Sequence, residues 1–435
     1  MKSKIDFLIQ WVVCSLLIFS FFTTAKAQST RVISGKVADA STNQPVPFVT
    51  VTTKSTLIGT VTNEEGGFDL VLPDSIRQDD LIITMIGYKM QSFSLSALPV
   101  PLNVRLQPDI VEMKEVQIKP QPPTYYLLLA ARSMKLNYPD KPFETQAYYR
   151  ENITENDGFL RSAEGVFRTY YPGFQDTLKN QNQLLLFHKA ESLSELAFMK
   201  KEREKSEARD KKREEKAVKK GRTVEKEKSE SNDSLKIGEM FGGPDNLLRL
   251  ADIVRSPDNC IDTTMFDEYT YSFAKSSSFN NAELMVINFK SRGKVDGNRE
   301  EGKVYLDIAS NAIVKIETRG TVVIPTLIRP VLFVMGIGAE NPKFNSVIEF
   351  QQVRDRWYPK NMQFNLDLNV EKKRMFSAND HSNFKIFGLL VVNKIDIGSP
   401  TPVEKAKRYS SDKKPEEQVF NDSGLTWDQI NVIKR

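Results

Sequence analysis

The stretch GTVTNEEGGFDLVLP, residues 59–73, joins two β-rich runs through a segment of glutamates and glycines. A calcium loop would need oxygen ligands at alternate positions and a closing glutamate five residues beyond a glycine. Asn63 and Glu65 alternate, but Gly66 and Gly67 lead directly into an apolar run without that glutamate. We therefore expect a β-hairpin with a tight turn, in which Gly67 takes the positive φ that glycine adopts without strain. Such a hairpin indicates an all-β domain.

The chain has 435 residues, which is long for one core and favours two domains. Its first residues are expected to lie outside both. Lysines precede the apolar run FLIQWVVCSLLIFSFF, and the segment AKA follows at a spacing suited to signal-peptidase cleavage. Residues 1–27 are therefore interpreted as a signal peptide, with the mature chain starting at Gln28. A retained membrane anchor is the alternative, although the run is short for a span.

This interpretation places the protein in the periplasm or on the periplasmic side of the outer membrane. Cys14 lacks the small preceding residue of a lipoprotein signal, so we expect no lipid anchor there. After cleavage Cys260 is the only cysteine, and no internal disulfide can form. No candidate base stands beside it in the sequence, so we expect an inert thiol rather than a reactive one. The fold must therefore rest on its hydrophobic cores.

The formal net charge of +5 is unevenly distributed along the chain. The signal segment contributes +2, and residues 200–230, with fourteen basic and nine acidic side chains, contribute another +5, which leaves −2 for the rest. No basic face therefore indicates a nucleic-acid partner. The charged run lacks aromatic residues and apolar stripes. It is interpreted as a solvated insertion, helical or disordered, with a partner-binding arm as the alternative.

Residues 31–107 contain short β-rich runs with the spacing of a β-sandwich. The run SGKVADASTNQPVPFVTVTTKSTLIGTVTNEEGGFDLVLP, followed by LIITMIGYK, resembles the carboxypeptidase-regulatory-like domain. The resemblance implies a seven-stranded transthyretin-like sandwich over residues 28–110, a module found at the N-terminus of Gram-negative envelope proteins and TonB-dependent receptors. It does not imply peptidase activity. The matching positions are Gly35, Pro47, Val51, Gly59, Thr62, Asn63, Gly67, Phe68, Gly87 and Tyr88.

Hydrolase motifs in this sequence are short and isolated. His188 and Glu191 have the His-x-x-Glu spacing of zinc carboxypeptidases, and His381 is the only other histidine. Zinc needs two imidazoles and a carboxylate, but the surroundings of His381 do not resemble that family's site. Ser382 and Lys385 match Ser-x-x-Lys without its companion motifs. We therefore expect no enzymatic activity, catalytic residue, metal or cofactor; a zinc-dependent hydrolase is the remote alternative.

A proline-rich linker at residues 111–123 leads into a C-terminal antiparallel α+β domain at residues 124–398. Thr124 can cap a helix over residues 125–136. Strands follow. In the run MQFNLDLNV, residues 362–370, apolar and polar side chains alternate as in a half-buried antiparallel strand.

The run GKVYLDIASNAIVKIETRG predicts a hairpin. The expected pairing sets Val304, Leu306 and Ile308 against Ala312, Val314 and Ile316. The segments PFETQAYYREN, GKVYLDIASNAIVKIE and RDRWYPKNMQF resemble a domain that accompanies the sandwich in uncharacterised envelope proteins. The hairpin and the W-Y-P strand start are also similar to the periplasmic lipoprotein-carrier half-barrel. That resemblance implies a curved sheet around a helix, with an apolar concave side. Residues 399–435 are interpreted as a polar C-terminal tail.

The segment TVVIPTLIRPVLFVMGIGAE is the most apolar of the second domain. Prolines and an arginine interrupt it, which disfavours a transmembrane helix. A buried hairpin is one interpretation, and a mobile flap that lines a lipid cavity is the other. The candidate apolar ligand contacts are Leu327, Val331, Leu332, Phe333 and Met335.

Together these features predict a mainly β protein, with an N-terminal seven-stranded β-sandwich followed by a curved antiparallel sheet with helices. The expected function is that of a non-enzymatic exported envelope protein that binds a protein partner. The alternative is a lipid or lipoprotein carrier or sensor with an apolar cavity in the C-terminal domain. Expected partners are an envelope protein or a lipid-like ligand, with association with the outer membrane and without nucleic acid. The sequence does not indicate an oligomeric state.

Overall fold

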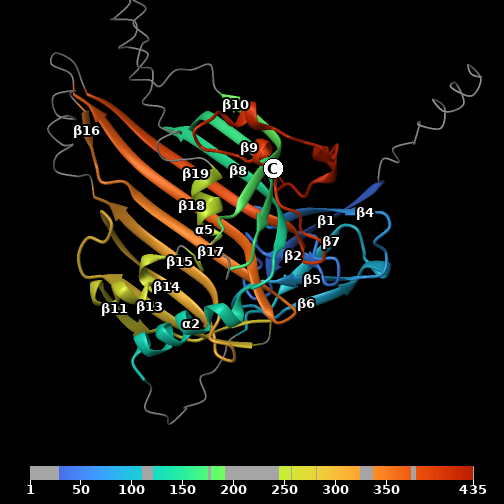
Figure 1. Ribbon diagram of the computed structural model, residues 1–435, viewed down its shortest axis with the longest axis horizontal. Helices are drawn as coiled ribbons and strands as arrows, with labels where there is room; N and C mark the ends of the chain where they lie inside the picture. The colour runs from blue at the N-terminus through green and yellow to red at the C-terminus, as the bar shows by residue number, and fades with distance from the viewer. Residues whose placement is uncertain are drawn as a thin grey trace, which may run out of the picture.

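The computed structural model describes residues 29–109, 121–174, 178–191, 244–255, 257–280, 282–323, 337–373 and 379–434. Strands dominate these ranges, which confirms the predicted mainly β class. They form a small two-sheet domain and one large antiparallel sheet (Figure 1). The predicted signal peptide, most of the predicted linker and the charged insertion lie outside the described residues.

The N-terminal domain is the expected seven-stranded sandwich. One sheet has the strand order β4-β1-β7 and the other has the order β3-β2-β5-β6. β1 pairs antiparallel with β4 and parallel with β7. The strands are β1 (Thr30–Asp39), β2 (Thr50–Thr53), β3 (Gly59–Val61), β4 (Gly67–Pro73), β5 (Asp80–Thr84), β6 (Gln91–Ser94) and β7 (Leu102–Leu106), with the 3-10 helix η1 (Leu95–Ala97) before β7.

Alternating apolar side chains of this sandwich meet between its two sheets. In β4, Phe68, Leu70 and Leu72 are fully buried, whereas Asp69 between them is half-buried. Burying each large apolar side chain stabilises the fold by roughly 1.5–3 kcal/mol. The sandwich therefore has a core of its own, made by Ile33, Val37, Val46, Val49, Val51, Phe68, Leu70, Leu72, Leu81, Ile83, Leu95, Leu102, Val104 and Leu106.

The turn at residues 63–67 reverses the chain but does not close a hairpin. β3 pairs with β2 in one sheet, and β4 pairs with β1 in the other. The predicted β-hairpin is therefore wrong, and the turn is a crossing between the two sheets of the sandwich. All three residues of β3 are buried, and the large sheet covers the side of β3 that carries Val61.

Gly66, and not Gly67, has the positive φ, at +70°. A Cβ on Gly66 would lie 2.3 Å from the backbone oxygen of Val37, whereas the nearest atom to a Cβ on Gly67 would be 3.3 Å away. Gly67 instead donates its N–H to the side chain of Asn63 at 2.7 Å. The prediction for Gly67 is wrong by one residue.

The second domain is built on a twelve-stranded sheet in the described residues. Its main order is β10-β9-β8-β19-β18-β17-β15-β14-β13-β11, with β12 on β13 and β16 on β18. The strands are β8 (Phe143–Glu155), β9 (Gly158–Tyr171), β10 (Gln181–Glu191), β11 (Tyr269–Phe273), β12 (Ser277–Phe279), β13 (Ala282–Ser291), β14 (Asn298–Asp307), β15 (Ile313–Val322), β16 (Ile337–Ala339), β17 (Lys343–Val353), β18 (Arg356–Lys372) and β19 (Asp380–Asp396).

Two strand predictions can be compared with this sheet. In β18, Met362, Leu366 and Leu368 are buried on one face, which confirms the alternation read from residues 362–370. β14 and β15 form the predicted hairpin, and Val304 pairs with Ile316. A β-bulge then sets Leu306 opposite Ile313 instead of Val314, because the bulge inserts one extra residue. Ile308 lies beyond the paired residues, in the turn.

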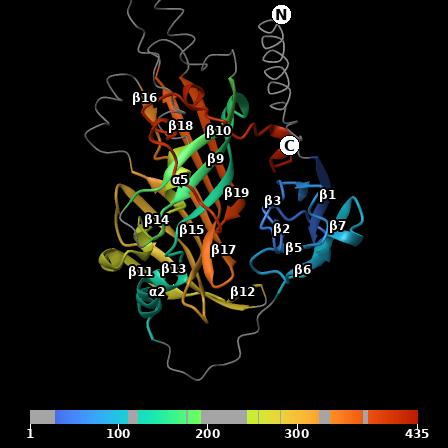
Figure 2. The ribbon, with the colours of Figure 1, turned by 45° about the vertical axis from the view of Figure 1, so that its right-hand side comes forward.

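Two helices pack on one face of the large sheet, which we call the inner face. They are α2 (Pro123–Asn137) and α5 (Pro244–Leu250) (Figures 1 and 2). Pro122 occupies the N-cap of α2 and Pro123 its first turn, so the prediction of Thr124 as the cap is wrong. Proline suits this position because the first N–H groups of a helix have no partner within it. Among the described residues, no helix is long and apolar enough to cross a membrane.

One large apolar core covers the part of the inner face that lies under α2 and α5. Leu127, Ala130 and Met134 of α2 belong to it, and Tyr138 after the helix donates its hydroxyl to the carbonyl of Ile313 at 2.7 Å. Burial raises the pKa of the Tyr138 hydroxyl far above its ordinary value. The 3-10 helices η2 (Asn259–Ile261) and η3 (Thr263–Glu268) close the side near β11. This part of the inner face is therefore packed, and Ile153, Leu366 and Ile386 form a separate buried cluster on the same face.

The opposite, outer face of the sheet carries the sandwich. Val61 of β3 packs against Tyr148 of β8 and against Leu389 and Val391 of β19, all of them buried. Asn393 adds a buried hydrogen bond from its side-chain nitrogen to the carbonyl of Gly59 at 3.1 Å. The contact between the two domains is therefore both apolar and hydrogen-bonded (Figure 2).

The end of the chain packs against both domains, although composition predicts a polar tail there. Phe420 donates its N–H to the carbonyl of Leu184 in β10 at 2.8 Å. Ile430 and Ile433 are 1% and 4% exposed. This region contains the 3-10 helices η4 (Lys405–Lys407), η5 (Pro415–Gln418) and η6 (Trp427–Gln429). We call residues 425–434 the C-terminal strap, because they bridge the sandwich and the sheet.

Candidate functional site

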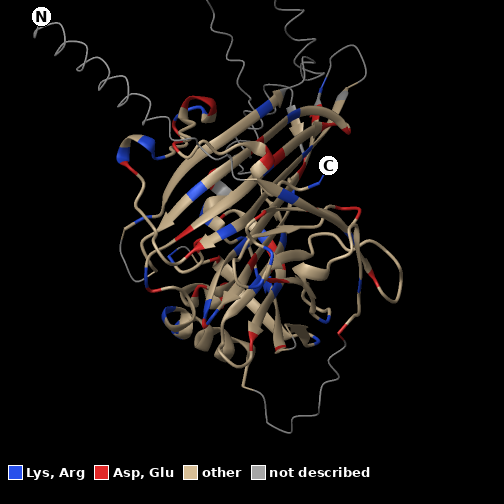
Figure 3. Ribbon diagram, turned by 90° about the vertical axis from the view of Figure 1, so that its right-hand side faces the viewer, with Lys and Arg blue, Asp and Glu red and all other residues tan. Residues whose placement is uncertain are grey.

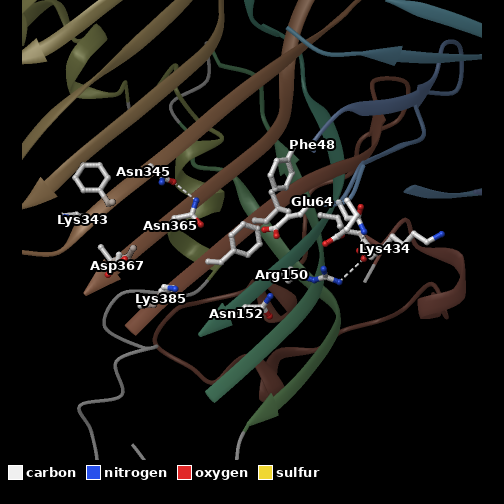
Figure 4. A pocket seen from close by; sticks show the side chains of 18 residues that line it. Phe48, Glu64, Arg150, Asn152, Lys343, Asn345, Asn365, Asp367, Lys385 and Lys434 are labelled. Atoms are coloured by element: carbon white, nitrogen blue, oxygen red, sulfur yellow. Dashed lines mark hydrogen bonds between the residues drawn. The ribbon is translucent and has the colours of Figure 1, made fainter. Parts of the chain in front are cut away.

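A cleft of about 750 Å³ opens where the sandwich meets the outer face of the large sheet (Figure 4). The sandwich contributes Phe48 and the turn at residues 63–65. Strands β8, β17, β18 and β19 contribute the opposite wall, and the C-terminal strap closes one side with Ile433 and Lys434. The volume is in the range of about 300–1,000 Å³ that is typical of ligand sites. Domain boundaries are also common places for such sites.

Phe48 enters this cleft from an unusual backbone conformation. Its φ is +58°, a region that bulky residues rarely adopt. The N–H of Phe48 donates to the carbonyl of Thr62 at 3.0 Å, and its ring packs beside the cluster around Val61 and Tyr148. Strain of this kind costs roughly 1–3 kcal/mol and is concentrated at functional sites. The cleft therefore has a strained backbone position at Phe48.

The two walls of the cleft carry exposed charges. Glu64 and Glu65 are exposed on the sandwich side, and within the described residues neither forms an ion pair. Lys343 is exposed on the sheet side, likewise without an ion pair among the residues that the structure describes. Lys343 stands opposite Asp367 in the pairing of β17 with β18, so the sheet wall carries both signs, and basic and acidic residues are interspersed along the strands of the sheet (Figure 3). The acidic turn carries negative charge alone and is available to a partner.

Other charged groups of the cleft are held by neighbours. Arg150 forms an ion pair with Glu164 at 2.9 Å and donates to the carbonyl of Ile433 at 3.0 Å. Lys385 lies 2.6 Å from Asp157, and Asp367 accepts from Asn383 at 2.7 Å. Arg150 therefore ties the C-terminal strap to the floor of the cleft.

Amide side chains form much of the floor. The side-chain nitrogen of Asn365 in β18 donates to the side-chain oxygen of Asn345 in β17 at 2.6 Å, and Asn152 of β8 accepts from Ser162 at 2.8 Å. A second groove, of about 690 Å³, crosses β11, β13, β14, β15 and β17 and shares Asn345 with the cleft. Polar side chains thus continue from the cleft across the outer face.

Buried charges beside this region are compensated inside the protein. Glu349 lies 3.0 Å from Lys315 and 3.4 Å from Lys360, and all three side chains are at most 10% exposed. Burial opposes its ionisation, but the two ammonium groups lower the pKa of Glu349 to about 2. Glu317, 2.8 Å from Lys315, supplies the second negative charge, so the two acids and two ammonium groups balance within the protein.

The inner side of the second domain holds a second buried cluster. Burial raises the pKa of Asp258 and of Glu300, and Tyr269 donates a short hydrogen bond to Glu300. Cys260 is fully buried beside them, and burial raises the pKa of its thiol well above the ordinary value. A thiol in this state is a poor nucleophile.

The residues singled out in the sequence do not meet in this structure. His188 lies on β10 and His381 on β19, with β9 and β8 between those strands. Among the described residues there is no group of three or more potential metal ligands. Ser382 is buried and donates to Glu155, whereas Lys385 is exposed beside Asp157.

The candidate apolar ligand contacts cannot be placed. Leu327, Val331, Leu332, Phe333 and Met335 lie outside the described residues. The residues that form the cleft were missed in the sequence, apart from the turn at residues 63–67. Only the acidic turn left a visible signal, because its glutamates follow no apolar pattern and stand beside the glycines.

Residues 33–118 match the CarboxypepD_reg-like domain family. This confirms the resemblance read from the sandwich residues and covers the first domain. Among curated proteins no relative matches the chain.

Three solved structures show distant likenesses to this chain. A DUF1329 family protein from Desulfovibrio piger has 10% identity and a TM-score of 0.21, over 64% of this chain and 95% of that one. A membrane-associated protein of unknown function from Bacteroides fragilis has 9% identity and a TM-score of 0.14, over 84% and 98%. Lipovitellin, studied for lipid–protein interactions, has 10% identity and a TM-score of 0.21, over 61% and 26%. With TM-scores this low, none of them supports an argument about function.

Proposed function

We propose that the protein is an exported, non-enzymatic envelope protein that binds a protein partner in the cleft between its two domains. The observation that carries this proposal is the acidic turn with Glu64 and Glu65 on the sandwich, which faces Lys343 on the sheet; none of the three forms an ion pair among the described residues. Complementary charges at a partner's surface would give specificity and speed association more than they would raise affinity.

Phe48 supplies the apolar anchor for such a partner. Aromatic side chains in the centre of an interface, surrounded by polar ones, contribute a large share of binding energy. Phe48 lies between the acidic turn and the sheet wall (Figure 4). Export rests on the signal-peptide pattern of residues 1–27.

Site-specific photo-crosslinking in the native envelope tests this proposal. A photoreactive phenylalanine analogue at position 48 should give a discrete adduct with one partner. The same analogue at Val32, which is 52% exposed on the sandwich but outside the cleft, should not. Reversing the acidic wall with Glu64→Lys and Glu65→Lys should remove the adduct without a change in melting temperature, since both side chains are exposed.

Two results would count against the proposal. One is equal crosslinking from positions 48 and 32, which would indicate random collision. The other is an adduct at position 48 that survives the double charge reversal, which would show that the charged walls do not select the partner.

A further inference from the structure

Helix α2 is apolar on two opposite sides. At 100° per residue, Tyr125, Leu129, Arg132 and Leu136 fall within one narrow stripe, and Leu128 flanks it. The opposite side carries Leu127, Ala130 and Met134, which are buried in the inner-face core. A surface helix usually has one apolar face, and a helix that is apolar all round is normally covered. Within the described residues, Leu128 and Leu129 of this outward stripe are half-buried, and Tyr125 and Leu136 at its two ends lack cover.

Exposure is concentrated around this stripe. Tyr125 is 43% exposed and Leu136 is 72% exposed. Phe273, 40% exposed, lies beside the start of the helix, because its ring is 5.8 Å from that of Tyr126. Ile308, 46% exposed, lies near the end of the helix, where Asn137 donates to the carbonyl of Ser310. Four of the nine large apolar side chains that are exposed in the described residues thus gather here.

We propose that this stripe seats the protein on the surface of a lipid bilayer that contains anionic headgroups. Residues 123–137 include Arg132 and Lys135 but no acidic residue. Leucines on such a stripe enter the boundary between headgroups and acyl chains, while tyrosine hydroxyls and basic side chains remain at the polar level. The proposal concerns a surface separate from the cleft and does not depend on the partner proposed there.

Charge contributes less to this contact than apolar area. The neighbouring elements carry exposed acids, namely Asp140 after the helix and Asp267 and Glu268 in η3, which contacts α2. These acids offset the two basic residues of the helix. We therefore expect binding to electrically neutral vesicles as well, with a moderate preference for anionic ones.

The position of the stripe fits this role. α2 lies on the inner face of the large sheet, whereas the sandwich and the cleft lie on the outer face (Figures 1 and 2). A protein that rests on lipid through α2 would therefore keep its cleft turned away from the bilayer. Lipid contact and partner binding can then occur together.

Vesicle co-sedimentation of the full mature chain tests the inference. Vesicles of phosphatidylcholine with about one-third phosphatidylglycerol should bind the protein, and the variant Leu136→Glu with Tyr125→Ser should bind at least about tenfold more weakly. Both side chains are exposed, so the melting temperature should not change. Phe159→Glu is the matched control, because Phe159 is also an exposed apolar residue, 49% exposed, but it lies on strand β9 and not on α2. It should bind like the unmodified protein.

The double variant Arg132→Gln and Lys135→Gln separates charge from apolar contact. It should lose the preference for phosphatidylglycerol while it still binds pure phosphatidylcholine vesicles. A preference that persists in this variant would overturn the assignment of the anionic contact to α2.

Three outcomes would overturn the inference as a whole. The first is no sedimentation of the unmodified chain with either vesicle. The second is equal sedimentation of the Leu136→Glu, Tyr125→Ser variant, which would place any lipid contact elsewhere. The third is a lower melting temperature of that variant without vesicle binding by the unmodified chain. In that case another protein segment, from the same chain or from a second copy, covers the stripe.

Discussion

The side chain of Asn431 pairs with the backbone of Val71 as a neighbouring strand would. The N–H of Val71 donates to the side-chain oxygen of Asn431 at 2.5 Å, and the Asn431 amide donates to the carbonyl of Val71 at 3.2 Å. Val71 lies in β4, an edge strand of the sandwich. One amide of the C-terminal strap therefore satisfies both polar groups of an edge residue, which an open edge would leave free for another chain.

Asn431→Ala should lower the free energy of unfolding by roughly 1–3 kcal/mol, because it leaves partly buried donors and acceptors without partners. Chemical denaturation of the mature chain measures this change. Asn369→Ala is the control, since the Asn369 side chain is exposed and bonds to Glu340 at the surface. An equal loss of stability in the two variants would show that Asn431 of the strap contributes no more than an amide at the surface.

Gly66 and Gly67 should differ sharply when each is replaced by alanine. Gly66→Ala should lower the free energy of unfolding by roughly 1–3 kcal/mol because of the positive φ alone. The clash of the new methyl group with the carbonyl of Val37 should lower it further. Gly67→Ala should change stability by less than about 1 kcal/mol, because the added methyl meets its nearest neighbour at 3.3 Å. Thermal unfolding of both variants measures this. A more damaging Gly67→Ala would mean that the turn has another conformation in solution.

Glu349→Gln should lower stability by roughly 3–5 kcal/mol, because it leaves Lys315 and Lys360 buried without their shared carboxylate. Since the folded pKa of Glu349 is lowered to about 2, its contribution is present above the ordinary glutamate pKa. It is lost as pH falls from there toward 2. Urea unfolding across that pH range should show that the variant loses less stability with falling pH than the unmodified protein. Glu317→Gln is the control and should cost only about 0–1 kcal/mol, because that partner of Lys315 is 36% exposed.

Glu300→Gln should change how stability depends on pH in the direction opposite to that of Glu349→Gln. Burial raises the pKa of Glu300, so the stability that its protonated form contributes is present at low pH and is lost as pH rises through the raised pKa. The variant cannot ionise there and should lose less stability between acidic and mildly alkaline pH. Glu301→Gln is the neighbouring control, because hydrogen bonds from Arg319 and Lys290 lower the pKa of Glu301. A parallel pH response of the two variants would contradict this assignment.

Local patterns were sufficient to predict the sandwich and some strands of the large sheet. Met362, Leu366 and Leu368 alternate with polar residues, and a half-buried strand follows from that period alone. The register of β14 on β15 was predicted only up to the bulge at Leu306, because an inserted residue has no fixed signature in the sequence.

Contacts between distant parts of the chain could not be predicted in this way. The turn at residues 63–67 was predicted, but the local pattern does not show that β3 pairs with β2 while β4 pairs with β1. The cleft has the same origin, since Glu64 and Lys343 face it from separate domains. The apolar residues on two sides of α2 are visible in the sequence, but by themselves they predict only a helix and not which side is covered.

The C-terminal strap also sets an order for assembly. The sandwich draws its core from residues 33–106, so it can fold as soon as that segment has been made. Its attachment to the sheet is different, because Asn431 and Val71 are 360 positions apart. During synthesis or export the early domain can therefore be folded before β8, β19 and finally the strap complete its attachment. Only then does the cleft acquire its third side, so a truncated or still-emerging chain would not present a complete binding site.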